Sequence, residues 1–386
     1  MKYRTFVMEN VLDSIIDYRG KTPKKSENGI KTLSAKSVRD GYIDYSQCYY
    51  ISKEEYDRFM VRGFPKVGDV LMTTEAPLGV LARLDRDDIA LAQRLITLRG
   101  KENVLDTGYL YYYLRSPVGQ GKIKERQTGT TVTGIKQAEF RKIEIALPSI
   151  DIQRKVASLL GVLDEKILVN KKINDNLLQQ ASALYKSYFI DMLPFNGIMP
   201  SNWHVGTVSE ITTLHDSKRI PLSGRERANL AKIYPYYGAT SIMDYVDKYL
   251  FDGIYLLLGE DGSVIDDKGF PILQYVDGKF WVNNHAHIIT GKNGFSVEML
   301  YLLFSLTNVQ SIVTGAVQPK ISQSNLNKVN VVIPSQEDCI KFDSVVQPFF
   351  AQIRNLRTEN SKLSELRDSL LPRLMSGEFD VSDIDI

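Results

Sequence analysis

The sequence is poor in cysteine and lacks long apolar runs. Its only cysteines are Cys48 and Cys339, and no stretch of about 18 consecutive apolar residues occurs. Two cysteines cannot build a disulfide framework or a cysteine-rich metal site, and they fit a reducing compartment. The N-terminal Met1-Lys2-Tyr3-Arg4 also lacks the apolar stretch of a signal peptide. We therefore expect a cytoplasmic protein.

Motifs for catalysis are missing as well. No Pro-Pro pair occurs, so the chain lacks the Asn/Asp-Pro-Pro-aromatic motif with which amino-methyltransferases hold the target amine. Gly20-Lys21-Thr22 imitates the end of a phosphate-binding loop, but Ile15 occupies the position that requires an earlier glycine. His285 and His287 have no third metal ligand near them in the sequence, so a structural or ligand-contacting role is favoured over metal binding. We predict no catalytic and no metal-binding residues in this chain.

Charge of either sign is not in excess. The chain has 48 Lys and Arg residues against 46 Asp and Glu residues, a formal net charge of +2. A protein that neutralises DNA phosphates by itself is usually far more basic. If DNA is the ligand, partner chains therefore supply much of the positive charge. With 386 residues, 43% of them hydrophobic, the chain is long enough for more than one core.

The chain repeats itself across its length. Subtracting 148 from 334 gives an offset of 186 between Pro148 and Pro334, each of which ends an apolar run. The same offset relates Gly129 to Gly315, Ile135 to Ile321, Gln137 to Gln323 and Lys142 to Lys328. Such a period indicates a domain duplication, since solenoid repeats are only about 20–50 residues long. Two similar sites related by a pseudo-two-fold axis suit a two-fold ligand such as duplex DNA.

Each half reads as a strand-rich stretch followed by a long helix. Short apolar runs separated by glycines predict strands within residues 1–147 and 193–333. The segments 109–114 and 299–304 occupy equivalent places and predict helices. The tyrosines of the first segment are candidates for a base-stacking platform, but packing in the core is the favoured interpretation.

Heptad spacing without glycine or proline predicts a helix between Gly161 and Leu193, and the same register recurs 186 residues later. The predicted seam between the two helices consists of Leu163, Ile167, Asn174, Leu177, Leu184, Phe349, Ile353, Leu356, Asn360, Leu363 and Leu370. Asn174 and Asn360 either fix the register near the crossing of an antiparallel pair or are solvated, and both interpretations stay open. Pro348 predicts a kink or a late start in the second helix.

These features together resemble the specificity subunit of a type I restriction-modification system. The resemblance covers the whole chain and rests on ordered, duplicated motifs. They include Gly68-Asp69-Val70-Leu71-Met72-Thr73-Thr74, Ala90-Leu91-Ala92-Gln93-Arg94, Tyr234-Pro235-Tyr236-Tyr237-Gly238, Asn283-Asn284-His285-Ala286-His287 and the tail Leu366 to Glu378. One departure lies at the helix starts, where Asp151 and Gln153 approximate the family's acidic-Gln pair but Glu337 and Cys339 stand in the second copy.

The resemblance implies an α+β fold with two duplicated mixed α/β target recognition domains, joined by two long helices that pack as an antiparallel coiled coil. The implied boundaries are 1–148 for the first recognition domain, 149–192 for the central helical spacer, 193–334 for the second recognition domain and 335–386 for the C-terminal spacer.

The resemblance also implies the division of labour. Each recognition domain reads one half of a bipartite target in double-stranded DNA, and the helices set the spacing and dock two modification subunits. Those subunits bind S-adenosylmethionine and methylate adenine, and recruited restriction subunits use ATP and Mg²⁺ to cleave. This chain binds no cofactor and has no catalytic role. The alternatives are a stand-alone nuclease or methyltransferase, disfavoured by the missing motifs, and a coiled-coil scaffold with duplicated ligand-binding domains.

Base edges and phosphates are contacted by basic, amide and hydroxyl side chains, so polar residues in loops are the candidates for DNA contact. In the first domain they are Arg19, Lys21, Thr22, Lys24, Lys25, Lys36, Thr73, Thr74, Gln93, Arg94, Thr128, Thr130, Thr131 and Lys136. In the second domain they are Lys218, Arg219, Arg225, Arg227, Tyr236, Tyr237, Asn283, Asn284, His285, His287, Gln318 and Lys320.

Overall fold

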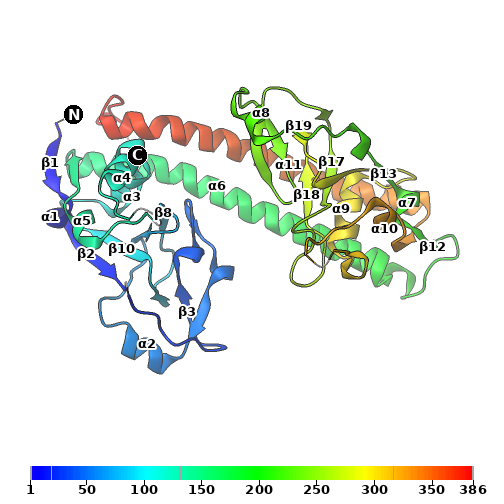
Figure 1. Cartoon of the computed structure of the whole chain (residues 1–386), viewed down its shortest axis with the longest axis horizontal. Helices are drawn as coiled ribbons and strands as arrows, with labels where there is room; N and C mark the ends of the chain where they lie inside the picture. The colour runs from blue at the N-terminus through cyan, green and yellow to red at the C-terminus, as the bar shows by residue number, and fades with distance from the viewer. Residues whose placement is uncertain (1, 19, 130–132, 316, 385–386) are drawn as a thin grey trace. The chain divides into compact units, whose positions relative to one another are not determined.

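The chain divides into two compact units, each containing a strand-rich domain and parts of two long helices (Figure 1). The computed structural model describes residues 2–18, 20–129, 133–315 and 317–384. The first unit comprises Met1–Val169 and Glu359–Ile386, and the second comprises Asn170–Thr358. Among the described residues, no helix has both the length and the apolar character needed to cross a membrane.

A four-stranded antiparallel sheet lies at the centre of the first unit. Its strand order is β2 (Leu12–Asp17), β10 (Leu95–Gly100), β7 (Val70–Thr74) and β8 (Leu78–Arg83). Side chains alternate between the two faces of a strand. Val70 and Met72 accordingly join one core with helix α3 (Thr107–Arg115), whereas Leu71 joins the core on the other face. β7 is buried on both faces, which explains its continuous apolar run.

Smaller sheets complete the first domain. In the three-stranded sheet β6–β3–β9, β3 pairs antiparallel with β6 and parallel with β9. The strands of the smaller sheets are β3 (Ile30–Leu33), β6 (Tyr49–Ile51), β9 (Ile89–Leu91), β1 (Arg4–Val7) with β11 (Glu144–Leu147), and β4 (Val38–Arg39) with β5 (Tyr42–Ile43). The remaining helices are α1 (Met8–Val11), α2 (Lys53–Phe59), α4 (Pro117–Glu125) and α5 (Gln137–Arg141).

The second unit repeats this plan in its central sheet, and its second sheet has one strand more than the counterpart in the first unit. Its central sheet has the order β13 (Thr212–Leu214), β20 (Ala286–Gly291), β17 (Tyr255–Gly259) and β18 (Leu273–Val276). The second sheet consists of β15 (Ile242–Val246), β14 (Tyr234–Tyr237), β19 (Lys279–Val282) and β16 (Phe251–Asp252), with a parallel β14–β19 pair. A two-stranded pair, β12 (His204–Thr207) with β21 (Asn330–Ile333), and the helices α7 (Val208–Ile211), α8 (Gly224–Ala228), α9 (Val297–Ser305) and α10 (Gln323–Asn327) complete it. The predicted duplication of mixed α/β domains is confirmed.

The tyrosine-rich helix α3 belongs to the core. Tyr109, Tyr111, Tyr112 and Tyr113 expose between 1% and 5% of their surface. Its counterpart α9 is likewise buried along most of its length. The core-packing interpretation is therefore correct, and a base-stacking platform is excluded for these tyrosines.

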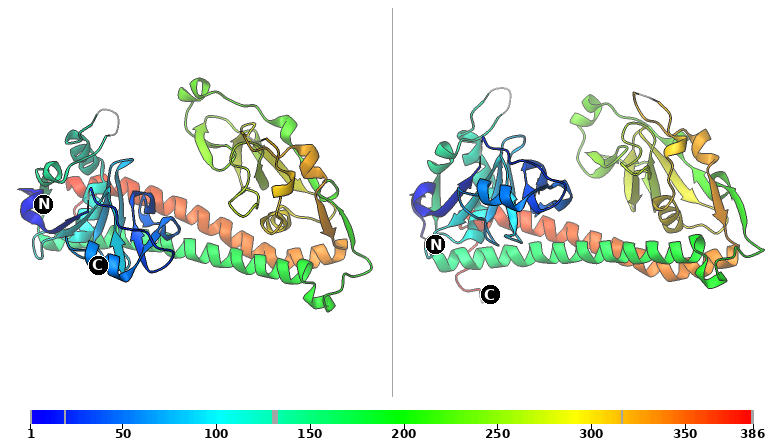
Figure 2. Two further views of the ribbon diagram at one scale, coloured as in Figure 1. Left: turned by 60° about the horizontal axis from the view of Figure 1, so that its bottom comes forward. Right: turned by 90° about the horizontal axis from the view of Figure 1, so that it is seen from below.

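Helices α6 (Ile150–Tyr185) and α11 (Gln336–Ser376) pack against each other in antiparallel orientation (Figure 2). In the first unit Arg367 Nη1 lies 2.7 Å from Asp164 Oδ1. In the second unit the rings of Tyr185 and Phe342 lie 5.6 Å apart between centroids. Residues later in α6 thus contact residues earlier in α11, as expected for an antiparallel pair. α11 begins at Gln336 and continues through Pro348, so the predicted late start is wrong.

Most of the predicted seam is buried or half-buried. Ile167, Ile353 and Leu356 expose 8%, 3% and 6% of their surface. Leu184 corrects the prediction: it is 39% exposed, and the adjacent Tyr185 takes the inward position at 3%. The half-buried members are Leu163, Asn174, Leu177, Phe349, Asn360, Leu363 and Leu370. Asn360 Nδ2 on α11 donates to the carbonyl of Ile167 on α6 at 3.3 Å, so its side chain reaches the partner helix. The register role of the two asparagines remains a prediction.

Each unit fastens its domain to the helices through one carboxylate. In the first unit Asp164 accepts hydrogen bonds from the Tyr112 hydroxyl at 2.8 Å and from Arg367 at 2.7 Å. These three residues come from α6, α3 and α11, so one side chain joins all three helices. In the second unit Glu298 on α9 has the corresponding role: its carboxylate accepts from Arg354 Nη1 on α11 at 3.0 Å.

The helix start in the first unit is also held from within the chain. Gln153 is 1% exposed, and its Oε1 accepts the Asp106 N–H at 3.0 Å. Its Nε2 donates to the Val104 carbonyl at 3.1 Å and to the Pro148 carbonyl at 3.0 Å. At the equivalent position Cys339 is fully buried. Both residues therefore serve the interior packing of their own unit.

Candidate nucleic-acid interface

In the first unit three segments meet at the end of strand β7. The Thr74 N–H donates to the Arg94 carbonyl at 3.0 Å, which ties down the turn before β10. The Ile135 N–H donates to the Thr74 carbonyl at 2.9 Å, which ties down the loop 127–136. One strand end thus holds both the turn and the loop that the sequence predicts to face DNA.

The second unit has the same arrangement in its main chain. The Glu260 N–H donates to the His285 carbonyl at 2.8 Å, and the Ile321 N–H donates to the Glu260 carbonyl at 2.9 Å. Glu260 follows Thr74 at an offset of 186, obtained as 260 minus 74, the offset of the sequence repeat. Within the turn, Asn283 Oδ1 accepts the His285 N–H at 2.8 Å. The duplication therefore includes the candidate site itself.

The loop has the same closure in both copies. Thr128 and Gly134 exchange two main-chain hydrogen bonds of 2.7 and 3.0 Å, and Thr314 and Lys320 exchange two of 2.8 and 2.7 Å. Gly315 has a φ of +90°, and a Cβ there would lie 2.2 Å from the Gln318 carbonyl oxygen. A glycine is therefore required for this tight turn. The candidates Thr130 and Thr131, like Arg19, lie outside the described residues.

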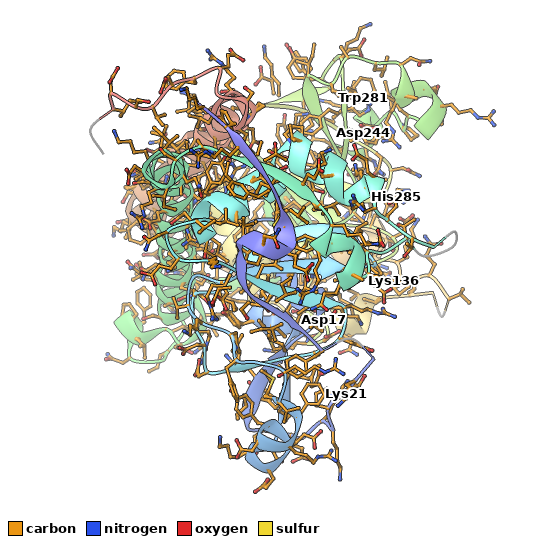
Figure 3. The ribbon with its side chains drawn as sticks, turned by 90° about the vertical axis from the view of Figure 1, so that its left-hand side faces the viewer. Asp17, Lys21, Lys136, Asp244, Trp281 and His285 are labelled. Carbon is orange, nitrogen blue, oxygen red and sulfur yellow. The ribbon has the colours of Figure 1, made fainter. Side chains whose placement is uncertain are left out.

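The exposed side chains around these strand ends carry donors of the kind DNA requires. In the first unit Arg94, Thr128 and Lys136 are exposed and Gln93 is half-buried. In the second unit Asn284, Gln318 and Lys320 are exposed and His285 is half-buried. Figure 3 shows Lys136 at the edge of the first unit, with Lys21 lower on the same side, and His285 of the second unit below Asp244 and Trp281.

Other exposed candidates lie on segments outside this constellation. In the first unit they are Lys21, Thr22, Lys24, Lys25 and Lys36, and in the second unit Lys218 and Arg225, with Tyr237 half-buried. Lys25 lies over the ring of Tyr49 at 4.9 Å, and the Ser26 N–H donates to the Tyr50 carbonyl at 2.8 Å. The basic segment that follows Arg19 therefore borders the sheet β6–β3–β9.

Five predicted contacts are buried, which corrects the prediction that they face DNA. They are Thr73, Thr74, Tyr236, Asn283 and His287, with between 0% and 4% of their surface exposed. Thr73 Oγ1 donates to the Pro77 carbonyl at 2.6 Å, so it stabilises the β7–β8 connection. The Tyr236 hydroxyl accepts the Leu222 N–H at 2.9 Å. The hydroxyl groups of Thr73 and Tyr236 are thus satisfied inside the domain and hold the loops in place.

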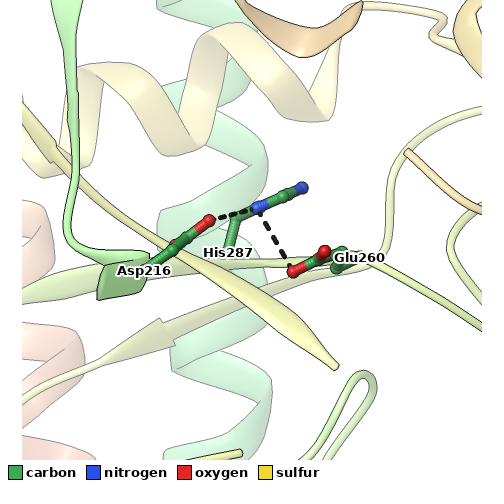
Figure 4. A group of neighbouring side chains, drawn as sticks. All are labelled: Asp216, Glu260 and His287. Carbon is green, nitrogen blue, oxygen red and sulfur yellow. Dashed lines mark hydrogen bonds and ion pairs between the residues drawn. The ribbon is translucent and has the colours of Figure 1, made fainter. Parts of the chain in front are cut away.

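His287 is part of a buried cluster with two carboxylates. Figure 4 shows Asp216 and Glu260 directed toward the same nitrogen of the His287 ring. His287 Nδ1 lies 2.6 Å from Asp216 Oδ2 and 3.7 Å from Glu260 Oε2, and its Nε2 lies 2.8 Å from the Ile321 carbonyl oxygen. Both nitrogens thus face acceptors, and both contacts are hydrogen bonds only if each nitrogen carries a hydrogen.

The cluster has the residue types of a metal site, because Asp216, Glu260 and His287 offer ligand atoms within 4.8 Å of one another. The sequence places no third ligand near His285 and His287, but the fold brings Asp216 and Glu260 to His287. However, Arg219 Nη1 lies 2.5 Å from Glu260, and Lys320 Nζ lies 3.2 Å from the same carboxylate. Two cations already neutralise these acids, and both imidazole nitrogens are occupied. The arrangement fits an internal ion-pair network better than a metal centre.

This network fixes the charge of Asp216. Burial by itself raises the pKa of the Asp216 carboxyl group, but the hydrogen bond and the charge of His287 outweigh it and hold that pKa below its ordinary value of 3.8. The Ile288 N–H and Gln323 Nε2 donate to the same carboxylate. Since Lys320 and Ile321 belong to the loop 314–321, the buried charges anchor this loop of the second domain.

Two predicted arginines are committed to partners inside the second unit. The side chains of Arg219 and Arg227 are 13% and 14% exposed. Arg227 Nη1 lies 2.7 Å from Asp244 Oδ2, and its guanidinium lies 4.8 Å from the centroid of the Tyr236 ring. Both arginines therefore support the fold of the candidate interface, with little surface left for a ligand.

Sequence reasoning missed the acidic members of the site. Glu75 Oε1 lies 2.8 Å from Arg94 Nε, and Asp261 Oδ1 contacts His285 Nδ1. Cations, amides and hydroxyls are the side chains that donate to base edges and phosphates, so that criterion does not point to carboxylates. The repeat offset was the available signal, because 261 minus 75 is again 186.

Comparison with known proteins places this architecture in a class. A family profile for the type I restriction modification DNA specificity domain matches residues 11–179 and 200–365. The chain is 27% identical over 362 residues to the type I restriction enzyme MjaIX specificity subunit of Methanocaldococcus jannaschii, covering 86% of this chain and 82% of that protein. It is 21% identical over 402 residues to the HindI specificity subunit of Haemophilus influenzae, covering 81% and 87%.

Structural comparison agrees on the fold. The crystal structure of the type I restriction-modification S subunit from M. genitalium superposes with a TM-score of 0.57 at 16% identity, covering 97% of this chain and 96% of that one. The chain and that S subunit therefore share a fold of duplicated α+β domains with paired long helices. The chain belongs to the type I restriction-modification specificity family, whose general function is the recognition of DNA targets, and it carries two copies of the family domain.

Proposed function

We propose that this chain is the DNA-reading subunit of a type I restriction-modification complex and that each recognition domain reads one half of a bipartite target. The observation that carries the proposal is the duplicated constellation at the ends of β7 and β17. In both copies one residue, Thr74 or Glu260, holds a polar turn and a glycine-containing loop by equivalent main-chain hydrogen bonds. Two equivalent interfaces on one chain suit a target with two separately specified halves.

The exposed groups at each constellation suit double-stranded DNA. Arg94 and Lys136 in the first domain, and Asn284, His285 and Lys320 in the second, offer donors and acceptors that fit base edges and phosphates. The formal net charge of the chain is only +2. Partner subunits therefore contribute much of the phosphate neutralisation in this proposal.

The long helices act as a spacer between the halves of the target. α6 has 36 residues, which corresponds to a length of about 54 Å at about 1.5 Å per residue. Each unit fastens its domain to the helices, through Asp164 or Glu298. A continuous helix fastened in this way keeps the number of base pairs between the half-sites fixed.

The helices also offer a surface for two modification subunits. On the part of α6 in the first unit, Val162, Leu168 and Val169 are 59%, 45% and 49% exposed. Val162 and Val169 are seven residues apart, so they lie on one face of the helix. Exposed apolar side chains grouped in this way mark protein contacts. Replacing both valines with glutamate is expected to abolish co-purification with the modification subunit, whereas Leu184→Glu on the same helix leaves it intact.

Catalysis belongs to the partners in this proposal. The modification subunits bind S-adenosylmethionine and methylate an adenine that is flipped out of the stack. The restriction subunits use ATP and Mg²⁺. The complex works in the cytoplasm, and this chain determines where on the DNA it acts.

The test is methylome sequencing of a host that expresses the chain with its modification subunit, compared with a host lacking this chain alone. The expected result is a methylated adenine in each half of a split motif, lost when the chain is removed. Methylation that persists unchanged contradicts the proposal and favours a scaffold whose duplicated domains bind another ligand.

A further inference from the structure

An acidic residue stands beside the reading turn in each recognition domain. Glu75 directly follows Thr74, and Asp261 directly follows Glu260, at the strand ends that organise the two sites. Glu75 Oε1 accepts from Arg94 Nε at 2.8 Å, and Asp261 Oδ1 contacts His285 Nδ1. The residue types differ between the copies, but the chemistry of a carboxylate holding a basic side chain is the same.

The carboxylates of Glu75 and Asp261 are unfavourable for binding DNA. DNA is a polyanion, so an acid within its interface lowers affinity for every sequence. The side chains of Glu75 and Asp261 remain 35% and 19% exposed, and those of Arg94 and His285 remain 53% and 41% exposed. Ion pairs that are open to solvent on one side, as these are, add only modestly to stability. The repetition of the pair in both domains therefore indicates a role in binding.

The geometry of both pairs leaves the outer atoms of the basic side chain available. Glu75 contacts Nε of Arg94, the inner nitrogen of the guanidinium group, and the two terminal nitrogens lie beyond it. Asp261 contacts Nδ1 of His285, so this contact does not use Nε2 on the other side of the ring, and 41% of the His285 side chain is exposed. Two parallel donors on an arginine match the O6 and N7 acceptors of guanine. Each acid thus fixes the direction in which a base-reading group points.

The acids themselves are held firmly. Glu75 forms an isolated antiparallel bridge with Gly134, and Asp261 forms the equivalent bridge with Lys320. In the first domain the turn is also specialised, because Arg94 has a φ of +69°, a left-handed conformation that is unfavourable for a residue with a Cβ. Such outliers gather at functional sites.

We propose that Glu75 and Asp261 are positioning residues that orient Arg94 and His285 and thereby set the base preference at one position in each half-site. This inference rests on the proposed function of the chain. At that position the basic side chain contacts the base, and the acidic side chain fixes the orientation of the basic side chain.

The experiment measures binding of the full complex, this chain with its modification subunits, to a panel of duplexes that vary one base pair of the target at a time. Arg94→Ala is expected to lower the preference at one base pair of the first half-site by about tenfold or more. Glu75→Ala lowers the preference at the same base pair and leaves the second half-site unchanged. In the double variant the two effects do not add, with a coupling of at least about threefold.

Conservative variants separate positioning from charge. Glu75→Gln keeps an oxygen that accepts from Arg94 Nε, so it retains most of the base preference while affinity for all sequences rises. The equivalent test in the second domain is Asp261→Ala, which changes one position of the other half-site. Asp57→Ala is the matched control, because it removes the acid of another exposed ion pair in the first domain, with Lys53 at 2.7 Å.

Each outcome decides one point. If Glu75→Ala only raises affinity for all duplexes equally, as Asp57→Ala does, or if its effect adds to that of Arg94→Ala, the acid has no positioning role and the inference is overturned. If the unaltered complex itself distinguishes no bases, the proposed function fails instead. A complex that reads a bipartite target, with variants that shift one position as described, supports both.

Discussion

Glu298 offers a sharp test of how the second recognition domain is fastened to its helices. Its side chain is 4% exposed and accepts hydrogen bonds from the Tyr275 hydroxyl at 2.6 Å, Arg354 Nη1 at 3.0 Å and Gln347 Nε2 at 3.0 Å. These partners come from β18 and α11, whereas Glu298 belongs to α9. The change Glu298→Ala therefore removes the only acid that these three donors share among the described residues.

The expected loss of stability follows from the burial of the pair. Removing one member of a buried ion pair costs about 3–5 kcal/mol, because the other charge is left uncompensated. The Arg354 side chain keeps 21% of its surface exposed and so retains some hydration. We therefore expect a loss at or just below the bottom of that range, about 2–3 kcal/mol. With a urea dependence of about 2 kcal/mol per M, the unfolding midpoint falls by roughly 1–1.5 M.

The chain contains a natural reporter for this experiment. Both of its tryptophans, Trp203 and Trp281, lie in the second unit, so tryptophan fluorescence follows the unfolding of that unit. Glu337→Ala is the control, because it removes an acid from α11, the helix that carries Arg354, and the ion pair of Glu337 with Lys341 is exposed. The control should leave the midpoint unchanged.

The double variant tests the electrostatic explanation directly. If uncompensated charge causes the loss, replacing Arg354 with methionine in the Glu298→Ala background restores part of the stability, and the two losses are not additive. A tryptophan transition in Glu298→Ala that coincides with that of the unaltered chain would show that Glu298 does not stabilise the second unit. A double variant whose loss equals the sum of the single losses would refute the electrostatic explanation.

Three further predictions concern the interior. Ile353→Ala, at a position 3% exposed, is expected to cost about 2–4 kcal/mol in urea unfolding, whereas Leu184→Ala, at a position 39% exposed, should cost under about 1 kcal/mol. Burial raises the pKa of the Cys339 thiol to about 12. A thiol reagent at pH 8 should therefore modify only Cys48 until urea is added. Fast labelling of both cysteines in the folded chain would contradict this prediction. The folded pKa of Asp216 lies below 3.8, so the stability that its charge contributes is complete above that pH and is lost as the pH falls through the folded value. Asp216→Asn should therefore weaken the acid dependence of tryptophan-monitored stability below about pH 4. An unchanged acid dependence would contradict this prediction.

Much of the fold was accessible from the sequence because it depends on repetition and periodicity. The offset between Pro148 and Pro334 predicted two copies of one domain, and the strand order of the two central sheets confirms it. Heptad spacing predicted the helix pair, but at Leu184 it chose the wrong one of two neighbours. Tyr185 supplies a larger apolar surface at that level, and spacing alone does not distinguish adjacent positions near a helix end.

The candidate site was less accessible because its members are distant in sequence. His287 is held by Asp216, 71 residues away, and by the Ile321 carbonyl, 34 residues away, so no local pattern distinguishes it from a surface histidine. Thr73 and Thr74 have the composition of a polar loop, yet they end a strand that is buried on both faces. Local polarity predicted which loops form the site, but burial decided which of their side chains are available.

The central claim is that one chain specifies two separate halves of a DNA target. The most direct test is selection from a library of randomised duplexes by the purified chain with its modification subunits, followed by sequencing of the bound DNA. The expected result is two blocks of specified base pairs separated by an unspecified gap of constant length. A single block of specified base pairs, or bound DNA with no base preference, would contradict it.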